Sequence, residues 1–375
     1  MRVAIVRAMP ELSIDIYSKN LILGLRKVRP DWEIIELAPR PFDRTNSSLI
    51  YRIQKYYERF WRYPKLVSWQ VKSVDLYHIV EPCVGHIVYW VKEKGKPIVV
   101  TCHDLINFSY PENAQKNTQI PQLSDNAWRY SVNGMKQADR IVAVSEATAK
   151  DTSRILDISP KLIEVVPNGV ETIFRPLPET EILSFRKQQG VSSETICLLN
   201  VGSNHPRKNI SNILQAIAIL KEKGLLIQFW KVGVDFTAEQ KKFIQTNYLD
   251  NNVKYLGKPN KLALRQIYNA ADILLAPSLY EGFGITLLEA MACGTPVITG
   301  SVSAMPEVVG NAGILVDPRN SQAIADEVLH LAQNPQIYHE LVEKGLARAK
   351  LFTWENTAKE IAEVYSQILH QTAVK

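Results

Sequence analysis

Short runs of apolar residues alternate with longer amphipathic stretches along most of the chain. Each short run has the length of a buried strand and is followed by turn-forming residues, whereas the longer stretches place apolar residues at helical spacing. This rhythm is typical of a parallel sheet whose strands are connected by helices. The predicted strands lie within residues 3–8, 32–38, 74–80, 97–104, 140–145 and 163–169, and then within residues 196–202, 226–233, 253–257, 271–278, 296–300 and 313–317.

The rhythm occurs twice, which predicts an α/β protein with two successive Rossmann-like, doubly wound domains. The segment 167–180 is the most plausible join, because it carries three prolines and ends in a polar run. A last helix is predicted over residues 354–371, and its apolar face could pack on either domain. Since open parallel sheets bind ligands beyond the carboxyl ends of their strands, we expect the functional site in a cleft between the domains.

The stretch 271–300 reads as strand, loop, helix, turn and strand. The predicted helix begins near Gly284, where the apolar residues fall on one helical face, and it ends at Gly294. Its first amides lack internal partners and lie at the positive end of the helix dipole, so phosphate or sugar hydroxyls can bind there. Gly282 and Gly284 carry no side chain that would block a close approach.

Two carboxylates flank this predicted helix start. Glu281 lies in the loop, and Glu289 lies five residues beyond Gly284. Because a carboxylate accepts hydrogen bonds from two vicinal hydroxyls, one could hold a sugar and the other a ribose. The alternative is a plain strand–helix crossover with two solvated glutamates, and this stretch alone does not choose between the two.

A basic turn, VGSNHPRKN, follows the predicted strand 196–202. Gly202 permits the turn, and Arg207 and Lys208 are predicted at a helix start, where cations oppose the dipole. This unfavourable placement suggests a bound anion between them, since arginine clamps phosphate oxygens in a fork and lysine supplies a point charge. The alternative is a solvated basic turn.

Two other polar positions follow predicted strands of the first half. His103 and Asp104 close the strand 97–104, although a lone histidine is more often structural. Ser13 follows the first strand and either caps the next helix or reaches a ligand.

Composition narrows the class of protein. The net charge of +6 is mild and is usually a solvated surface, but it can also favour anionic partners such as sugar nucleotides, phospholipid head groups or nucleic acid. No zinc finger or RNA-binding signature indicates nucleic acid. The four cysteines are far apart, no apolar run reaches membrane-spanning length and no signal peptide is recognisable, so we expect a cytoplasmic protein. No D-x-D motif is present, and no metal is predicted.

Two further segments bear on partners. Residues 50–72 combine six Lys or Arg with seven aromatic residues. Such a segment either packs its aromatics on the sheet or lies on an anionic membrane surface as peripheral contact. Residues 107–126 lack periodicity and are predicted as a long loop that selects the acceptor.

The motif E-G-F-G-I-T-L-L-E resembles the E-x7-E signature of the retaining glycosyltransferases of family 4, also called group 1, which have the GT-B fold. The neighbouring P-S-L-Y-E-G-F-G and E-A-M-A-C-G-T-P-V-I resemble that family over about 30 residues without a gap, and residues 144–174 resemble it again. The resemblance implies an acceptor-binding domain over 1–170, a nucleotide-sugar-binding domain over 171–353, and a helix over 354–375 that crosses back to the first domain.

The same resemblance implies an activity. The protein would be a retaining, metal-independent glycosyltransferase of polysaccharide biosynthesis that moves a sugar from a nucleotide sugar to a glycan, lipid-linked or other hydroxyl acceptor, without a cofactor. Glu281 would contact the donor sugar and Glu289 the ribose, while Arg207 and Lys208 would hold the diphosphate and His103 a sugar hydroxyl. The remaining implied donor contacts are Gly202, Ser203, Gly282, Phe283, Gly284, Ile285, Thr286 and Leu287, and the weaker candidates are Ser13 and Asp104.

Two departures from the family pattern keep alternatives open. The first strand–helix loop lacks the glycine pair of many relatives, and Ser203 stands where some relatives have arginine. The alternatives are a GT-B sugar-nucleotide 2-epimerase and a non-catalytic nucleotide-sugar-binding subunit. The sequence also leaves open whether retention uses a covalent carboxylate intermediate or same-face attack, with a positioning role favoured for Glu281.

Overall fold

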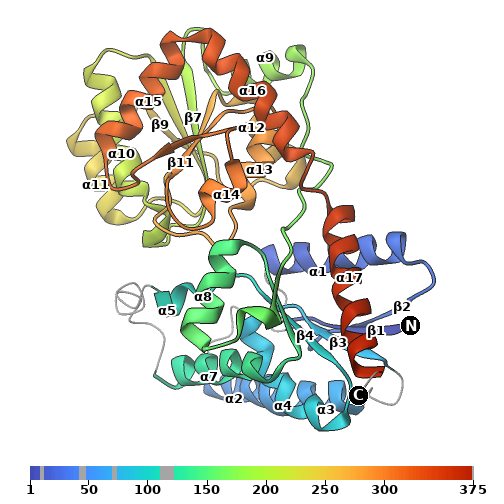
Figure 1. Cartoon of the computed structure of the whole chain (residues 1–375). Helices are drawn as coiled ribbons and strands as arrows, with labels where there is room; N and C mark the ends of the chain where they lie inside the picture. The colour runs from blue at the N-terminus through green and yellow to red at the C-terminus, as the bar shows by residue number, and fades with distance from the viewer. Residues whose placement is uncertain (9–11, 42–47, 70–73, 110–121, 374–375) are drawn as a thin grey trace. The chain divides into compact units, whose positions relative to one another are not determined.

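The computed structural model describes the chain except for residues 9–11, 42–47, 70–73, 110–121 and 374–375. The chain divides into two compact units (Figure 1). The first unit contains Met1–Gly169 together with Trp354–Lys375, and the second contains Val170–Thr353. Each unit is a parallel sheet covered by helices, as the alternating pattern predicts.

In the described part of the first unit, six parallel strands form a sheet in the order β2-β1-β3-β4-β5-β6. One face carries α1 and α17, and the other carries the helical segments that follow β2, β3, β4 and β5. The strands are β1 Arg2–Val6, β2 Glu33–Leu37, β3 Leu76–Ile79, β4 Ile98–Cys102, β5 Arg140–Ala143 and β6 Ile163–Val165, and the main helices are α1 Leu12–Val28, α7 Gln122–Asn133, α8 Glu146–Leu156 and α17 Trp354–Ala373.

The C-terminal helix α17 packs on α1 within the first unit (Figure 1). Gly24 permits this close approach, because a Cβ there would lie 2.7 Å from the Cβ of Ala358. A buried polar chain also connects α17 to the sheet: Tyr365 bonds His78 Nδ1 at 2.5 Å, and His78 Nε2 bonds Thr101 at 2.7 Å. Burial lowers the pKa of His78 to about 3, so the ring is neutral within this series of hydrogen bonds.

The second unit repeats the architecture, with described strands in the order β12-β11-β10-β7-β8-β9. Helices α10 and α15 cover one face of this sheet. The strands are β7 Ile196–Gly202, β8 Ile227–Gly233, β9 Val253–Tyr255, β10 Ile273–Ala276, β11 Val297–Gly300 and β12 Ile314–Val316, and the helices include α9 Glu179–Gln188, α10 Ile210–Glu222, α11 Ala238–Thr246, α12 Lys261–Ala270, α13 Ile285–Ala292, α14 Met305–Val309, α15 Ser321–Gln333 and α16 Pro335–Ala349.

The twelve predicted strands are all present, because strands buried on both faces read as apolar runs bounded by turn residues. Two other predictions need correction. The predicted loop 107–126 ends in helices, α5 (Ile106–Ser109) and α7, and its middle lies outside the described residues. The segment 50–72 is not a single α-helix, since α2 (Leu49–Tyr57) and α3 (Tyr63–Trp69) are joined by a π turn, Glu58–Arg62. The end of the segment, residues 70–72, lies outside the described residues.

Candidate functional site

The strand order of the second unit brings two distant loops together. From β7 the chain moves outward through β8 and β9, then returns to β10 on the other side of β7. The loops after β7 and β10 therefore diverge at a topological switch point, where α/β sheets bind ligands. The two loops are bonded directly: the Leu279 amide donates to the Arg207 carbonyl at 2.7 Å, and the Asn209 side chain donates to the Pro277 carbonyl at 3.0 Å.

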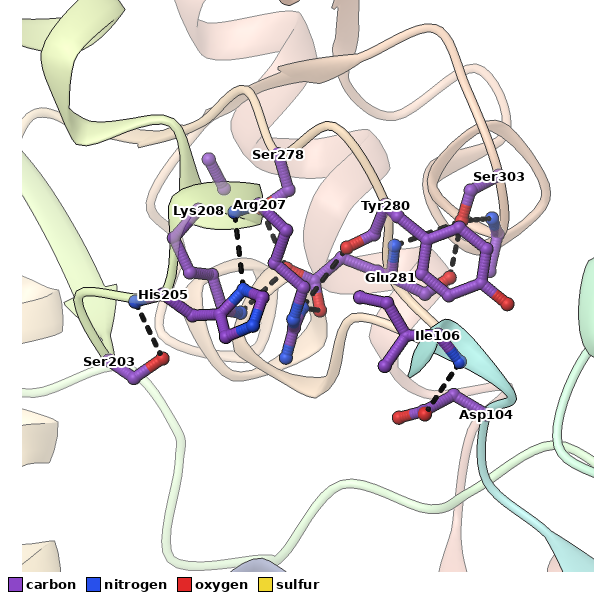
Figure 2. Close-up of polar contacts among 12 residues, drawn as sticks. Asp104, Ile106, Ser203, His205, Arg207, Lys208, Ser278, Tyr280, Glu281 and Ser303 are labelled. Atoms are coloured by element: carbon purple, nitrogen blue, oxygen red, sulfur yellow. Dashed lines mark hydrogen bonds and ion pairs between the residues drawn. The ribbon is translucent and has the colours of Figure 1, made fainter. Parts of the chain in front are cut away.

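Glu281 is the centre of the polar cluster at this switch point (Figure 2). Its side chain is buried, and three groups donate to its carboxylate. Lys208 Nζ and Ser278 Oγ each lie 2.6 Å from Oε1, and Arg207 Nη1 lies 2.5 Å from Oε2. Burial works against ionisation, but the charges of Lys208 and Arg207 outweigh it and hold the pKa of Glu281 at about 2. The cluster therefore contains a permanently charged carboxylate.

Arg207 and Lys208 occupy a different backbone position from the one predicted. They lie on a 3-10 turn, Pro206–Lys208, which ends at Asn209 in the left-handed region with φ +60°, and α10 begins only after it. The anion between the two cations is the Glu281 carboxylate itself, as Figure 2 shows. A diphosphate that bound these cations would compete with Glu281 for them.

Ser303 fixes the backbone of Glu281. Its hydroxyl accepts from the Glu281 amide at 2.9 Å and donates to the Glu281 carbonyl, which fixes the position from which the carboxylate projects (Figure 2). Ser303 has φ +59°, a conformation that costs free energy for a residue with a side chain. Sequence reasoning missed Ser303, and it named the motif around Ser278 without a role for that hydroxyl. A single serine in a loop gives no sequence signal that it fixes a neighbouring backbone, as Ser303 does, or donates to a carboxylate, as Ser278 does.

The start of α13 matches the predicted geometry. Gly284 caps the helix with φ +96°, and a Cβ there would meet Leu287 Cδ1 at 3.0 Å, so glycine is required. Gly282 and Phe283 are buried behind it, whereas Ile285 and Thr286 remain partly exposed. The first amides of α13 are the groups that lack intrahelical partners.

Glu289, on the same helix, has the opposite electrostatic environment. It is partly buried and accepts a hydrogen bond from Tyr268 Oη at 2.8 Å. Burial, reinforced by Glu171, raises the pKa of Glu289 to about 7 in spite of this hydrogen bond. The two glutamates of one motif are thus separated by their surroundings into a permanent anion and a group that titrates near neutrality. Tyr268 was not identified from the sequence.

The glycine turn after β7 is packed tightly. Gly202 has φ +150°, and the Lys208 side chain lies against it, with Cε 3.4 Å from the position of a Gly202 Cβ. Ser203 is exposed and its hydroxyl accepts from the His205 amide at 3.4 Å (Figure 2). The predicted site residues of the second unit therefore lie on connected loops and on the helix α13 that begins at one of them.

The remaining predicted residues belong to the first unit. His103 Nε2 donates to the Val80 carbonyl at 2.9 Å, and burial lowers the pKa of His103, so the ring is neutral. Asp104 accepts from the amide of Ile106, the first residue of the short helix α5, at 3.2 Å. The side chain of Ser13 lies outside the described residues. The donor contact of His103 stays a prediction.

The described residues provide neither a metal-binding cluster nor a membrane-spanning helix. In the parts of the chain that the structure describes, no three His, Cys, Asp or Glu side chains gather in a way that could hold a metal ion. Within the same parts, no helix combines the length and apolar character needed to cross a bilayer.

The fold and the switch-point cluster define a two-domain α/β enzyme of the GT-B type. The family model of the glycosyl transferases group 1 matches residues 181–348, and that of glycosyltransferase family 4 matches residues 24–174. The chain belongs to the family 4, group 1 glycosyltransferases, as the motif resemblance indicated. It is therefore a glycosyltransferase.

Individual relatives are distant. The chain is 27% identical to the O-antigen chain mannosyltransferase B of Escherichia coli over 81% of this chain and 77% of that protein. It is 28% identical to the D-inositol 3-phosphate glycosyltransferase of Actinosynnema mirum over 76% of this chain and 70% of that protein. Among solved structures, it resembles the sucrose-phosphate synthase of Thermosynechococcus elongatus, with TM-score 0.79, 20% identity and coverage of 99% and 100%. It also resembles Anabaena HepE in complex with UDP and glucose, with TM-score 0.77, 19% identity and coverage of 98% and 100%.

Proposed function

We propose that this glycosyltransferase is retaining and metal-independent, and that it moves a sugar from a nucleoside-diphosphate sugar to a hydroxyl of a glycan or lipid-linked acceptor. The observation that carries the proposal is the buried Glu281 carboxylate held by Arg207 and Lys208 beside the glycine-capped start of α13. The crystallised relative with UDP and glucose supports a nucleotide-sugar donor, and the mannosyltransferase supports a polysaccharide acceptor.

The charges of this cluster fit departure of a diphosphate. Leaving-group charge develops in the transition state, and fixed cations and helix amides stabilise it without reorganisation. Arg207 and Lys208 supply two such charges from one turn, and the α13 amides supply aligned dipoles. These groups would take the role that a divalent metal has in other transferases.

Glu281 is better suited to positioning than to covalent catalysis. Lys208 and Ser278 donate to one oxygen and Arg207 to the other, and a pKa near 2 makes the carboxylate a weak base. A carboxylate with both oxygens occupied is a poor nucleophile, although it can still orient a sugar hydroxyl. This argument supports same-face attack, in which the departing phosphate takes the acceptor proton.

The proposed reaction is tested by incubating the protein with UDP- and GDP-sugars and a panel of glycan and lipid-linked acceptors, with and without a chelator. A product that keeps the anomeric configuration of the donor, formed equally with chelator, is the expected result. Activity that disappears with chelator and returns with Mg²⁺ or Mn²⁺ contradicts metal independence. A new sugar nucleotide formed without acceptor identifies an epimerase, and donor binding without any turnover identifies a binding subunit.

Glu289 gives a prediction about pH. If the ribose hydroxyls donate to the Glu289 carboxylate, binding requires the ionised form, which the free protein loses below pH 7. The affinity for donor is therefore expected to rise as the pH increases from 6 to 8, by up to about tenfold for each pH unit below the pKa. Glu289→Gln should raise the KM for donor more than it lowers kcat, and it should remove this part of the pH dependence.

Titration calorimetry of donor binding at several pH values measures this effect. The diphosphate of a nucleotide sugar is esterified at both ends and does not titrate between pH 6 and 8, so the difference between wild type and Glu289→Gln isolates the side chain. Identical pH profiles in the two proteins would exclude Glu289 from the ribose site.

We also propose that the enzyme contacts an anionic membrane, on its cytoplasmic face, through the helical segment 49–69. Large apolar side chains recur there every four residues on the outside of the segment. The π turn widens the helix in the middle, which offsets part of the drift of an i+4 row around an α-helix. The row consists of Leu49, Ile53, Tyr57, Trp61 and Trp69, all at least 55% exposed. Lys65 lies four residues from each of the two tryptophans and completes the spacing.

Cations accompany this row, which supports an anionic membrane as the partner. Lys65 lies 5.7 Å from the Trp61 ring and 5.0 Å from the Trp69 ring, and Arg52 is exposed in the first helix of the same segment, α2. Exposed aromatic residues with adjacent cations suit the headgroup region of an anionic bilayer. Lys55, which lies over the Tyr51 ring, adds a third charge.

Membrane binding is tested by sedimentation with vesicles. Since each cation near an anionic surface adds about 1 kcal/mol, three cations predict roughly 10²-fold stronger binding to phosphatidylglycerol vesicles than to phosphatidylcholine vesicles. The combined variant Ile53→Ser, Trp61→Ser and Trp69→Ser should lose this binding. The control combines Leu183→Ser and Leu262→Ser, two exposed leucines of the second unit, and should bind as the wild type does. A wild-type protein that stays in the supernatant with both vesicles refutes the membrane contact.

A further inference from the structure

A fully buried lysine lies beneath the glycine turn of the switch-point site. Lys231 is on β8, in register with Asn200 of β7, and its side chain is 0% exposed. Its Nζ donates to the Gly202 carbonyl at 2.8 Å and to the Val232 carbonyl at 2.9 Å. The positive charge is therefore stabilised by carbonyl dipoles, directly below the turn that carries Gly202.

The Gly202 peptide is fixed from several sides. Its carbonyl also accepts from the Val234 amide at 3.1 Å, and a Cβ on Gly233 would lie only 2.2 Å from the same oxygen. The side chain of Lys208 lies against the Gly202 α-carbon. Two ammonium groups thus flank one peptide, Lys208 toward the site and Lys231 toward the core.

This arrangement is costly in the free protein. A buried ammonium group loses its hydration, and an apolar residue on β8 would avoid that cost. Burial, followed by repulsion from Lys208, lowers the pKa of Lys231 to about 8, and only Asp235 raises it. Asp235 is itself paired with Lys241 at 2.6 Å, so it compensates Lys231 only in part. A bound anion near the glycine turn would offset the remaining cost.

We propose that Lys231 is a positioning residue for the donor diphosphate, which it attracts and aligns from below the Gly202 turn without touching it. This inference rests on the proposed function, because it requires a diphosphate between Gly202 and Lys208. The bound diphosphate would stabilise the charged form of Lys231, so that binding near pH 8 takes up a proton.

Calorimetric titration of the full chain with UDP and with GDP tests this inference. Lys231→Met removes the charge and keeps an unbranched side chain of similar length. We expect its Kd for the nucleoside diphosphate to rise about tenfold or more at pH 7, where wild-type Lys231 is charged. The wild-type affinity should fall from pH 7 to pH 9, with a binding heat that depends on the buffer because a proton is taken up. Both effects should be absent from Lys231→Met.

The control is Lys221→Met, which removes another lysine that donates to a carbonyl, that of Tyr248 at 2.6 Å, away from the site. This variant should match the wild type in Kd and proton uptake. Melting curves show whether Lys231→Met folds. If it does not, proton uptake by the wild type at pH 8 tests the role of Lys231. Uridine, which has no phosphate, is then the reference ligand. No proton uptake, or an unchanged Kd in folded Lys231→Met, overturns the role of Lys231 and leaves the proposed function intact. If neither diphosphate binds the wild type, the proposed donor site itself fails.

Discussion

Glu281→Gln is expected to bind the nucleoside diphosphate of its donor more tightly than the wild type and yet to transfer sugar about 10²–10³-fold more slowly. This factor is the usual effect of removing one preorganised polar group that stabilises a transition state. In the free protein the Glu281 carboxylate occupies Arg207 and Lys208. A neutral amide leaves both cations available for phosphate and removes one negative charge from the site. If Glu281 orients the donor sugar as proposed, the same change replaces one of its two acceptor oxygens by an amide group and removes the charge, so chemistry should slow while binding improves.

Steady-state kinetics with the donor and calorimetry with the nucleoside diphosphate separate these two effects. Glu340→Gln is the matched control, because Glu340 is an exposed glutamate paired with Lys344 at 3.3 Å on α16, and it should leave both quantities unchanged. Weaker diphosphate binding in Glu281→Gln would show that the carboxylate holds the cations in place instead of competing for them. Turnover close to the wild-type value would remove Glu281 from the reaction.

Acid unfolding gives an independent measure of the same cluster. The folded pKa of Glu281, about 2, is lower than the usual value for glutamate of 4.5. A depressed carboxyl pKa contributes stability that is present above the unfolded value and is lost as the pH falls toward the folded value. The wild type should therefore lose free energy of unfolding between about pH 4.5 and 2, and Glu281→Gln should lack that part of the loss.

Most of the fold was predictable because its determinants are local. Parallel strands buried on both faces give apolar runs, and glycine or polar residues end them, so all twelve strands were identified from their own residues. The cap of α13 was equally local, since it depends on Gly284 and the helix that follows. The π turn at Glu58–Arg62 was not predictable, because its hydrophobic pattern is also compatible with a continuous α-helix.

The residues of the site were identified singly, but their pairing was not. Arg207 and Lys208 are more than 70 residues from Glu281, and they meet because β10 lies beside β7, an order that apolar runs do not specify. The hydroxyl of Ser303 and the phenol of Tyr268 acquire roles only through tertiary contacts. The same holds for the contrast between the two glutamates, since burial and neighbours set their pKa values and sequence spacing does not.

Loss of either site cation should have the second large effect. Arg207→Met and Lys208→Met are each expected to lower kcat/KM for the donor by about 10²–10³-fold, because each removes a fixed charge that stabilises the leaving diphosphate. Lys223→Met, which removes a lysine paired with Asp326 at 2.9 Å on the surface of the same unit, should have no effect. The preference for a nucleoside diphosphate over the bare nucleoside should shrink in both site variants if, as proposed, the phosphates are the part of the ligand that contacts these charges.

The Arg207 variants also connect the two predictions. Each loss of a cation leaves Glu281 with one partner fewer, so part of its effect arises from a misplaced carboxylate. Combining Arg207→Met with Glu281→Gln separates the contributions: if the cation acts on the diphosphate directly, Arg207→Met should weaken diphosphate binding at least as strongly in the Glu281→Gln background as in the wild type, because Glu281 no longer competes for Arg207 there. If that loss disappears in the double variant, Arg207 acts only by holding Glu281, and stabilisation of the leaving group must come from Lys208 and the amides of α13.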